Sequence, residues 1–438
     1  MDKKFWAEEI ETIGRDELEE YQLEKLKAQI ELAYEKSPYY RETFDASGVS
    51  PKDIKKLDDI RKFPILTKQT IRDRQDKKPI LGDLVTVDEE QVVFISSSSG
   101  STGTPTASPF SKVDFDLFQD VESRLFWAVG MRPKDRYIHA LNFSLFVGGP
   151  DVIGAQNLGA LCIWAGTIPT DRLLFILKEY RPNIIWTTPS YAWYLGETAL
   201  SKGIDIKKEL SIRTIIVAGE PGGSIPATRQ AIEDLWGAEV YDFYGISDIF
   251  GACAGACEYH DGLHIAEDHI LVEVVDEKTG EPVEEGQRGE MLLTTLRKEA
   301  RPMIRFKTGD IVTYSDQRCQ CGRTHKRINI VGRVDDMFIC SGVNVFPSDI
   351  EVVIRDIVDL TGEYRITVLT DNHITKFNLE VEKRKDSAIS DDKLIDKISK
   401  EIKTQLGIKP KEILLLEDGE LPRSTHKAKR ILDIRKEK

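Results

Sequence analysis

The chain has 438 residues, with 61 lysines and arginines against 74 aspartates and glutamates, which gives a formal net charge of −13. Its hydrophobic share of 40% excludes full disorder, and at roughly 100 to 200 residues per domain the length predicts two or three domains. Nonspecific binding to nucleic acid or to an anionic membrane depends on clustered lysine and arginine, so the acidic total argues against both. An anionic ligand would need a local site.

No segment approaches the roughly 18 consecutive apolar residues that a membrane helix needs, and the first residues lead into charge instead of an apolar signal core. We therefore predict a cytoplasmic protein with no membrane partner. In a cytoplasmic chain of this size, closely spaced cysteines indicate a metal site or buried thiols more than a disulfide scaffold. The six cysteines are Cys162, Cys253, Cys257, Cys319, Cys321 and Cys340.

The first 90 residues are predicted to be mainly helical. From Asp16 onward, apolar residues recur at spacings of three and four with charges between them, which is the pattern of one face of a helix. Beyond residue 90, short β-rich runs alternate with helical patterns, and this alternation predicts a parallel sheet with crossover helices. The runs are 92–95, 137–140, 184–187 and 214–218.

After Gly332 the pattern changes to a unit of about 100 residues with two strand-like runs and one apolar helical stripe, typical of a compact α+β domain. We place the boundary between residues 334 and 335. The predicted fold is therefore an α/β protein, with a large N-terminal α/β domain over 1–334 and a small α+β domain over 335–438. This arrangement favours a ligand held between the two domains.

A loop rich in serine, threonine and glycine, SSSSGSTGTPT at 96–106, follows the predicted strand 92–95 directly. Glycines let successive backbone N–H groups turn toward an anion, and hydroxyls add donors without bulk, so the composition suits a triphosphate. The loop is not a Walker A motif, because no lysine follows its second glycine. A flexible linker is the alternative, which the preceding strand and Pro105 make less favourable.

Five segments in order resemble the core motifs of the adenylate-forming enzymes. They are the 96–106 loop, AGEPGG at 218–223, DFYGISD at 242–248, KTGD at 307–310 with GRVDD at 332–336, and LPRSTHKAKR at 421–430. Within that superfamily the chain is most similar to the phenylacetate-CoA ligase family. This resemblance covers essentially the whole chain and rests on TTPSY at 187–191, GLHIAEDH at 262–269 and GVNVFPSDIE at 342–351.

The resemblance implies a two-step reaction with ATP, Mg²⁺ and coenzyme A. A small-molecule carboxylic acid attacks the α-phosphorus of ATP and releases pyrophosphate, and a thiol, usually that of coenzyme A, then takes the acyl group from the acyl-adenylate. A relative that passes the acyl group to an amine, a hydroxyl or a carrier protein is the first alternative. A nucleotide-binding protein that has lost catalysis is the second. No nucleic acid partner is implied, and a homodimer stays open.

The resemblance also implies a nucleotide site. Ser99, Gly100, Ser101, Thr102 and Gly103 would wrap the β- and γ-phosphates. Glu220, Pro221, Asp242, Phe243 and Tyr244 would frame the adenine, where an aromatic offers a stacking face, with Gly219, Gly245 and Ser247 beside them. Asp310 would accept from the ribose hydroxyls, and Arg333 would donate to ribose or phosphate. A buried strand end is the alternative for the adenine segments.

Four further residues take roles in catalysis and domain motion by the same resemblance. Lys427 would meet the charge that develops as carboxylate and α-phosphate join, because a lone ammonium on a mobile arm can enter for one step and leave for the next. Asp248 stands where the family usually has glutamate, the residue associated with Mg²⁺, and its shorter side chain favours contact through water. The small domain would pivot at Asp335. Gly342 would border the coenzyme A tunnel.

Phe143, Ser144, Gly149 and Tyr191 lie where relatives line the acyl pocket. The aromatic residues among them, together with Trp164, favour an apolar acid, aryl or arylacetic. The alternative is that these aromatic residues belong to the hydrophobic core, in which case they carry no information about the substrate.

Cys319 and Cys321 form a tight turn that can direct two thiolates at one ion, and Cys257 with His264 or His260 can complete a Cys₃His set for structural Zn²⁺. The resemblance favours His264 over His260. Reduced buried cysteines are the alternative, and Cys253 is a spare candidate ligand.

Overall fold

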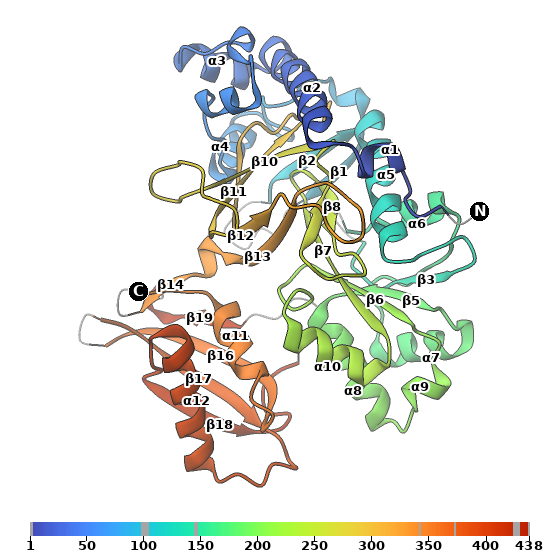
Figure 1. Cartoon of the computed structure of the whole chain (residues 1–438), viewed down its shortest axis with the longest axis vertical. Coiled ribbons are helices and arrows are strands. Elements are labelled where there is room, and N and C mark those ends of the chain that lie inside the picture. The colour runs from blue at the N-terminus through green and yellow to red at the C-terminus, as the bar shows by residue number, and fades with distance from the viewer. Residues whose placement is uncertain are drawn as a thin grey trace.

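The structure is a computed structural model that describes residues 3–97, 105–143, 148–340, 343–371, 374–423 and 430–436. A large N-terminal part, coloured from blue through yellow to light orange in Figure 1, is built around one long sheet. A smaller C-terminal part, orange to red, lies beside helices α8 and α10 of the large part. The predicted α/β class and the small α+β unit are both confirmed.

The long sheet has 11 strands in the order β10-β11-β12-β13-β9-β8-β7-β6-β5-β3-β4. The half from β4 to β7 is parallel, and the half from β7 to β10 is antiparallel. The strands are β3 (Arg136–His139), β4 (Leu161–Trp164), β5 (Ile184–Thr187), β6 (Thr214–Ala218), β7 (Glu239–Ile246), β8 (Phe250–Gly255), β9 (Leu263–Ile265), β10 (Ile270–Val275), β11 (Gly289–Thr295), β12 (Phe306–Ser315) and β13 (Arg327–Arg333).

Helices cover both faces of the parallel half, so its strands are buried on both sides. Ile184 and Trp186 of β5 enter one hydrophobic cluster, whereas Ile185 between them enters another. The first cluster includes α5 (Lys112–Ala128) and α6 (Val152–Leu158). The second includes α7 (Thr170–Tyr180), α8 (Pro189–Ser201), α9 (Ile206–Glu209) and α10 (Pro226–Trp236).

The N-terminal segment is mainly helical, as predicted. Its longest helix begins at Arg15, whose guanidinium donates to both carboxylate oxygens of Glu267 at 2.9 Å, and Tyr40 donates to the Pro302 carbonyl at 2.8 Å. These bonds tie the helices to the antiparallel half of the sheet. The helices are α1 (Glu8–Glu11), α2 (Arg15–Lys36), α3 (Pro38–Ala46) and α4 (Lys68–Lys77), with 3-10 turns η1 (Pro51–Asp53), η2 (Leu57–Lys62) and η3 (Glu89–Gln91).

The C-terminal part has its own hydrophobic cluster, formed by residues from Phe338 onward. A four-stranded sheet in the order β18-β17-β16-β19 carries two helices, and the short turn η4 (Val334–Asp336) precedes it. The division at 334 and 335 itself stays a prediction. The elements are β14 (Phe338–Cys340), β15 (Val343–Val345), α11 (Pro347–Arg355), β16 (Leu360–Asp371), β17 (Ile374–Lys383), α12 (Asp391–Leu406), β18 (Glu412–Glu417), β19 (Ile431–Asp433) and η5 (Ile434–Lys436).

One strand prediction is wrong in its pairing. The run 92–95 was expected to join the parallel sheet, but β1 (Val92–Ser97) pairs antiparallel with β2 (Ala107–Ser111) in a separate two-stranded sheet. β1 ends at Ser97 and β2 begins at Ala107, which leaves too few residues for the crossover connection that a parallel pair needs. Within the described residues, no helix is long and apolar enough to cross a membrane.

Candidate active site

The β1–β2 hairpin places the predicted phosphate loop beside the segment that contains Asp248. Ser96 Oγ donates to the Ser247 carbonyl at 3.0 Å, and Thr106 Oγ1 lies 3.5 Å from Asp248 Oδ1. Ser99, Gly100, Ser101, Thr102 and Gly103 lie outside the described residues. The two flanks of the loop are therefore fixed against the 247–248 segment.

Asp248 is surrounded by cations that the sequence did not suggest. Its carboxylate is 1% exposed and lies 2.9 Å from Arg301 Nη2 and 3.5 Å from Lys68 Nζ. Lys298 Nζ donates to the backbone carbonyls of Asp248 at 3.0 Å and Ile249 at 2.7 Å. Burial, with the nearby Arg301, lowers the pKa of Lys298 to about 7. The negative charge of Asp248 is thus already compensated by the neighbouring Arg301 and Lys68.

Three predicted nucleotide residues do meet. Tyr244 donates to Asp310 Oδ2 at 2.6 Å, and Arg333 Nη1 donates to Asp310 Oδ1 at 2.6 Å. Gly309 adopts a φ of +76°, and a Cβ there would lie 3.2 Å from Arg333 Nη2, so glycine gives the arginine room. Burial first, and then the Asp310 charge, raises the pKa of Tyr244 well above its usual value. The phenol therefore stays a hydrogen-bond donor.

Three of the residues expected around the adenine, Asp242, Phe243 and Tyr244, follow one another on β7, where successive side chains point to opposite faces of the sheet. Phe243 is 2% exposed and packs 5.3 Å from Trp186, ring centroid to centroid, so it faces the core and offers no stacking face. The Phe243 ring therefore cannot stack on the adenine, and stacking by Tyr244 stays a prediction. Asp242 accepts from Ser224 Oγ at 2.5 Å, and burial raises the pKa of its carboxyl to about 7.

Helix α8 begins beside the predicted adenine segment. Glu220 accepts from the backbone N–H of Ser190 at 2.9 Å, in the first turn of the helix. Gly219 precedes Glu220 with a φ of +91°, and Pro221 after it is exposed. Gly245 lies at the irregular β7–β8 pairing, where a Cβ would meet the Gly251 carbonyl oxygen at 2.3 Å. The binding roles of these residues stay predictions.

Two of the aromatic residues expected at the acyl pocket form a flat surface. The rings of Phe143 and Trp164 stack with centroids 5.5 Å apart and an interplanar angle of 7°, and Trp164 is 50% exposed. A Cβ on Gly149 would lie 2.8 Å from Phe143 Cα, so only glycine fits there. Tyr191 instead packs in the second hydrophobic cluster, with its hydroxyl 3.2 Å from Thr170 Oγ1. Ser144 lies outside the described residues.

A pair of buried acids behind this segment was missed. Glu122 of α5 is 0% exposed and Asp151 is 1% exposed. Both Glu122 oxygens and one Asp151 oxygen lack a hydrogen-bond partner among the described residues. Burial raises the pKa of both carboxyls well above the usual range, and the charge of Asp151 adds to the effect on Glu122. Glu122 lies on a helix, where nothing in the local pattern distinguishes it from a surface acid.

The four predicted metal ligands come together from two segments, 257–264 and 319–321. The ligand atoms of Cys257, His264, Cys319 and Cys321 all lie within 4.8 Å of one another and are buried. Cys257 Sγ is 3.7 Å from Cys319 Sγ, and Cys321 Sγ is 3.5 Å from His264 Nε2. Ligands at tetrahedral angles and normal zinc bond lengths would be about 3.8 Å apart for two sulfurs and about 3.6 Å for sulfur and nitrogen. The donor set and its spacing therefore fit zinc.

The alternative ligand His260 lies elsewhere, with its ring stacked on Tyr241 at 4.9 Å. Cys253 is buried in the main core instead. The turn that carries Cys319 and Cys321 is fixed by Arg323, whose Nε donates to Glu11 at 2.7 Å. This contact joins the N-terminal helix α1 to the cluster.

Lys427 and Gly342 lie outside the described residues, so their roles stay predictions. Asp335 lies in η4, with its carboxylate 3.7 Å from Arg333 Nη2, and its role as a hinge is likewise untested. The residues on either side of the segment 424–429 are described. Arg423 pairs with Glu382 at 2.8 Å, and Arg430 pairs with Glu363.

Comparison with known proteins agrees with this arrangement. Family models described as AMP-binding enzyme and AMP-binding enzyme C-terminal domain match residues 14–295 and 342–435. A phenylacetate-coenzyme A ligase from Thermus thermophilus is 36% identical and covers 98% of this chain and 99% of its own length. A 2-hydroxyisobutyryl-CoA ligase structure is 29% identical and covers 99% of this chain and 93% of its own. Its TM-score is 0.93 in the postadenylation state with 2-HIB-AMP and 0.75 in the thioesterification state with 2-HIB-AMP and CoA.

Proposed function

Because the chain belongs to the phenylacetate-CoA ligase family of AMP-binding enzymes, we propose that it activates an aryl or arylacetic acid and passes the acyl group to coenzyme A. In the first step a carboxylate oxygen attacks the α-phosphorus of ATP, pyrophosphate leaves, and an acyl-adenylate forms. In the second step the thiol sulfur attacks the acyl carbon, the thiol proton is lost, and AMP leaves. The Tyr244–Asp310–Arg333 group is the observation that carries this proposal.

In that group, the Asp310 carboxylate would accept hydrogen bonds from the ribose hydroxyls. Its two oxygens are oriented by Tyr244 and Arg333, so the acceptor is held in place before the nucleotide arrives. Because Arg333 is 44% exposed, its guanidinium can still turn toward a phosphate. Lys427 would meet the charge that develops between carboxylate and α-phosphate.

The stacked rings of Phe143 and Trp164 support an aromatic acid, because a flat exposed aromatic surface favours a flat apolar partner. A panel of phenylacetate, benzoate and 2-hydroxyisobutyrate with pyrophosphate readout tests this. Phenylacetate or benzoate should release pyrophosphate. Failure of both, with turnover of 2-hydroxyisobutyrate, would reject the aryl assignment.

The acceptor is tested with the acid that the panel identifies. Release of AMP should depend on coenzyme A. Exchange between ATP and pyrophosphate without any AMP release upon addition of coenzyme A would indicate another acceptor. Lys427→Ala should abolish turnover; a wild-type protein with the same negligible rate would indicate a nucleotide-binding protein without catalysis.

Magnesium would neutralise the ATP phosphates and orient the pyrophosphate for departure. We propose that Asp248 contacts this ion through water, because Arg301 and Lys68 already compensate its carboxylate. Asp248→Asn should therefore raise the magnesium concentration needed for half-maximal activity without abolishing the reaction. Complete loss of activity at saturating magnesium would argue for a direct ligand.

We also propose that Cys257, His264, Cys319 and Cys321 hold one structural zinc ion. With four protein ligands, such a site has no open position for chemistry. All six cysteines lie in the described part of the chain and none of them forms a disulfide, which supports the predicted cytoplasmic compartment. Metal analysis of the purified protein should give one zinc per chain, and a stable preparation without zinc would reject the site.

A further inference from the structure

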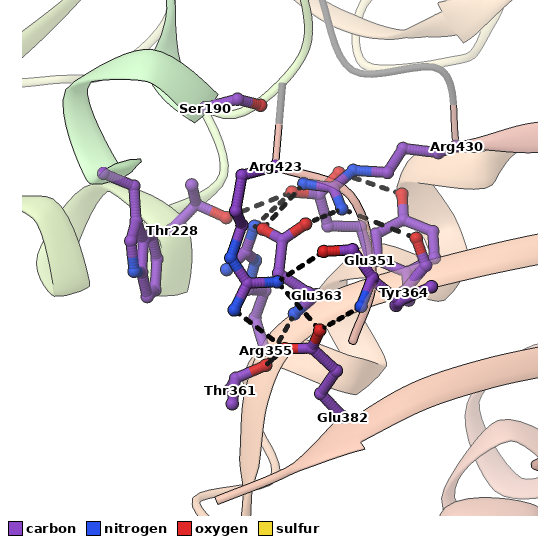
Figure 2. Close-up of polar contacts among 12 residues, drawn as sticks. Ser190, Thr228, Glu351, Arg355, Thr361, Glu363, Tyr364, Glu382, Arg423 and Arg430 are labelled. Atoms are coloured by element: carbon purple, nitrogen blue, oxygen red, sulfur yellow. Dashed lines mark hydrogen bonds and ion pairs between the residues drawn. The ribbon is translucent and has the colours of Figure 1, made fainter. Parts of the chain in front are cut away.

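The two parts of the molecule meet at an aromatic ring of α8. The guanidinium of Arg355, at the end of α11, lies over the Trp193 ring with its Cζ 4.4 Å from the ring centroid. On its other side Arg355 lies against Gly362, which has a φ of +90° and where a Cβ would come within 2.2 Å of Arg355 Nη1. Arg355 is therefore held between the backbone of its own domain and the indole of the other. Figure 2 shows Arg355 together with Glu351 and Glu363 of the small domain.

Trp193 is held in turn by a residue that reaches the small domain itself. The Trp193 Nε1–H donates to Glu197 Oε1 at 2.7 Å, and Glu197 Oε2 lies 4.0 Å from Arg423 Nε. Arg423 is fixed in the small domain by two bonds to Glu382, at 2.9 and 2.8 Å. One turn of α8 thus faces two arginines of the small domain.

The N-terminal end of the same helix reaches the candidate nucleotide site. Its first turn is bound to Glu220 through the Ser190 N–H, three residues before Trp193. Since a helix rises 1.5 Å per residue, the bond to Glu220 and the aromatic contact are about one turn apart. The small domain therefore contacts the same helix that borders the predicted adenine segment.

The domain arrangement in this structure agrees with one state of a relative. The TM-score is 0.93 against the postadenylation state and 0.75 against the thioesterification state of the same 2-hydroxyisobutyryl-CoA ligase. The contacts at α8 thus occur in a domain arrangement that resembles the postadenylation state more than the thioesterification state. They are also weak ones, since Arg423 is 4.0 Å from Glu197, and Arg355 meets Trp193 by ring contact alone.

We propose that the Trp193–Arg355 stack and the Glu197–Arg423 contact form a latch that holds the small domain in the adenylate-forming orientation. Trp193 and Arg355 are positioning residues, because neither belongs to the residues expected to touch substrate. The small domain must leave this orientation before the thiol step. The contacts of the latch therefore have to be weak enough to break in each catalytic cycle. This inference rests on the proposed two-step function.

The test compares the two half-reactions in Trp193→Ala. Exchange between ATP and pyrophosphate, with the acid from the panel, should fall about tenfold, since loss of a partly buried cation–π contact shifts a two-state equilibrium by that order. The release of AMP from a synthetic acyl-adenylate of the same acid upon addition of coenzyme A should stay within about twofold of wild type, because that step needs the latch open.

Two substitutions separate the latch from a general defect. Trp193→Phe keeps an aromatic face and should retain exchange within about threefold of wild type. Phe175→Ala removes a matched aromatic on α7, whose ring lies 5.2 Å from Arg172 within one domain, and should leave both half-reactions unchanged. An equal loss of both half-reactions in Trp193→Ala, or no loss in either, overturns the proposal.

A readout without substrate distinguishes failure of the latch from failure of the proposed function. Amide hydrogen exchange of α11 and of residues 360–364 should be faster in Trp193→Ala than in wild type and unchanged in Phe175→Ala. If no acid of the panel is activated, the proposed function fails while this measurement still tests the contact. Unchanged exchange in Trp193→Ala rejects the latch even where the enzyme is active.

Discussion

The cysteine–histidine cluster and the contacts at α8 both join segments that are far apart in the sequence, but by opposite means. The cluster is buried, its ligand atoms lie within 4.8 Å of one another, and its spacings match one tetrahedral ion. The α8 contacts use a guanidinium over a ring at 4.4 Å and an ion pair at 4.0 Å. The first arrangement fits a permanent connection, and the second fits one that opens in each catalytic cycle.

With the proposed latch, contacts that stay closed are short and buried, whereas contacts that must open are longer or more exposed. Within the large domain, the buried side chains of Arg124 and Asp268 form two bonds of 2.7 and 2.9 Å. Between the domains, Arg288 and Asp349 form an ion pair at 3.1 Å in which the arginine side chain is 54% exposed. Substitutions in the two regions should therefore act on different properties, stability in one and the balance of half-reactions in the other.

The largest effect is expected at the cluster. Cys321→Ser should abolish zinc binding and lower the free energy of unfolding by more than about 4 kcal/mol, because loss of a structural metal belongs to the strongest class of destabilising changes. Urea denaturation with parallel metal analysis measures both. Cys162→Ser, at a partly buried cysteine outside the cluster, is the control. A zinc-free Cys321→Ser protein as stable as wild type would contradict a structural role.

Asp248→Ala should cost roughly 3 to 5 kcal/mol of unfolding free energy, because it leaves the buried Arg301 guanidinium without its partner. Asp248→Glu keeps the charge and should recover part of this loss. Urea unfolding curves of the two variants provide the measurement. Equal stability of Asp248→Ala and wild type would show that the ion pair is dispensable and that this region resembles the domain interface.

Glu122→Gln should change how stability depends on pH. Burial raises the pKa of Glu122 and Asp151, so the folded state binds more protons than the unfolded state above the ordinary carboxyl pKa near 4.5. Stability contributed by these protons is complete below that pH and is lost as the pH rises through the raised values. The variant should therefore lose less stability than wild type between pH 5 and pH 9, by roughly 1 to 2 kcal/mol.

Unfolding free energies at intervals across that pH range test this prediction. Glu281→Gln, at an exposed position, should leave the slope of stability against pH unchanged. If Glu122→Gln keeps the wild-type slope, the buried pair does not control it, and another group must be sought.

The smallest effect is expected at the rim of the domain interface. Arg288→Ala removes an exposed ion pair with Asp349 and should change the unfolding free energy by less than about 0.5 kcal/mol. Both half-reactions should stay within about twofold of wild type, since this contact lacks the ring stack of the latch. A loss of unfolding free energy above about 1 kcal/mol would show that the Arg288–Asp349 pair contributes to stability like the contacts within the large domain.

The strands of the parallel half could be predicted well because their pattern is local. Ile184–Thr187 and Thr214–Ala218 have the predicted bounds, since short apolar runs between helical patterns indicate strands buried on both faces. The same pattern could not say which neighbour a strand pairs with, so β1 was assigned to the wrong sheet. The antiparallel half was not predicted, because its register depends on contacts between distant segments.

For the site, the family motifs and the cysteine spacing identified residues that lie together in the structure. The cluster of Cys257, His264, Cys319 and Cys321 and the meeting of Tyr244, Asp310 and Arg333 were both expected. Lys68, Lys298 and Arg301 around Asp248 were missed, because a buried lysine or arginine has the same local pattern as a surface one. Phe243 was misassigned because a motif does not state which side of a strand each residue faces.

The ion pairs at Arg423 and Arg430 have a consequence for the segment between them, which includes Lys427. Arg423 is bound to Glu382 and Arg430 to Glu363, and both carboxylates belong to the small domain. The two ends of the segment therefore move as one body with that domain. In the proposed function, the orientation of the small domain at α8 would therefore decide whether the Lys427 ammonium reaches the reacting phosphate.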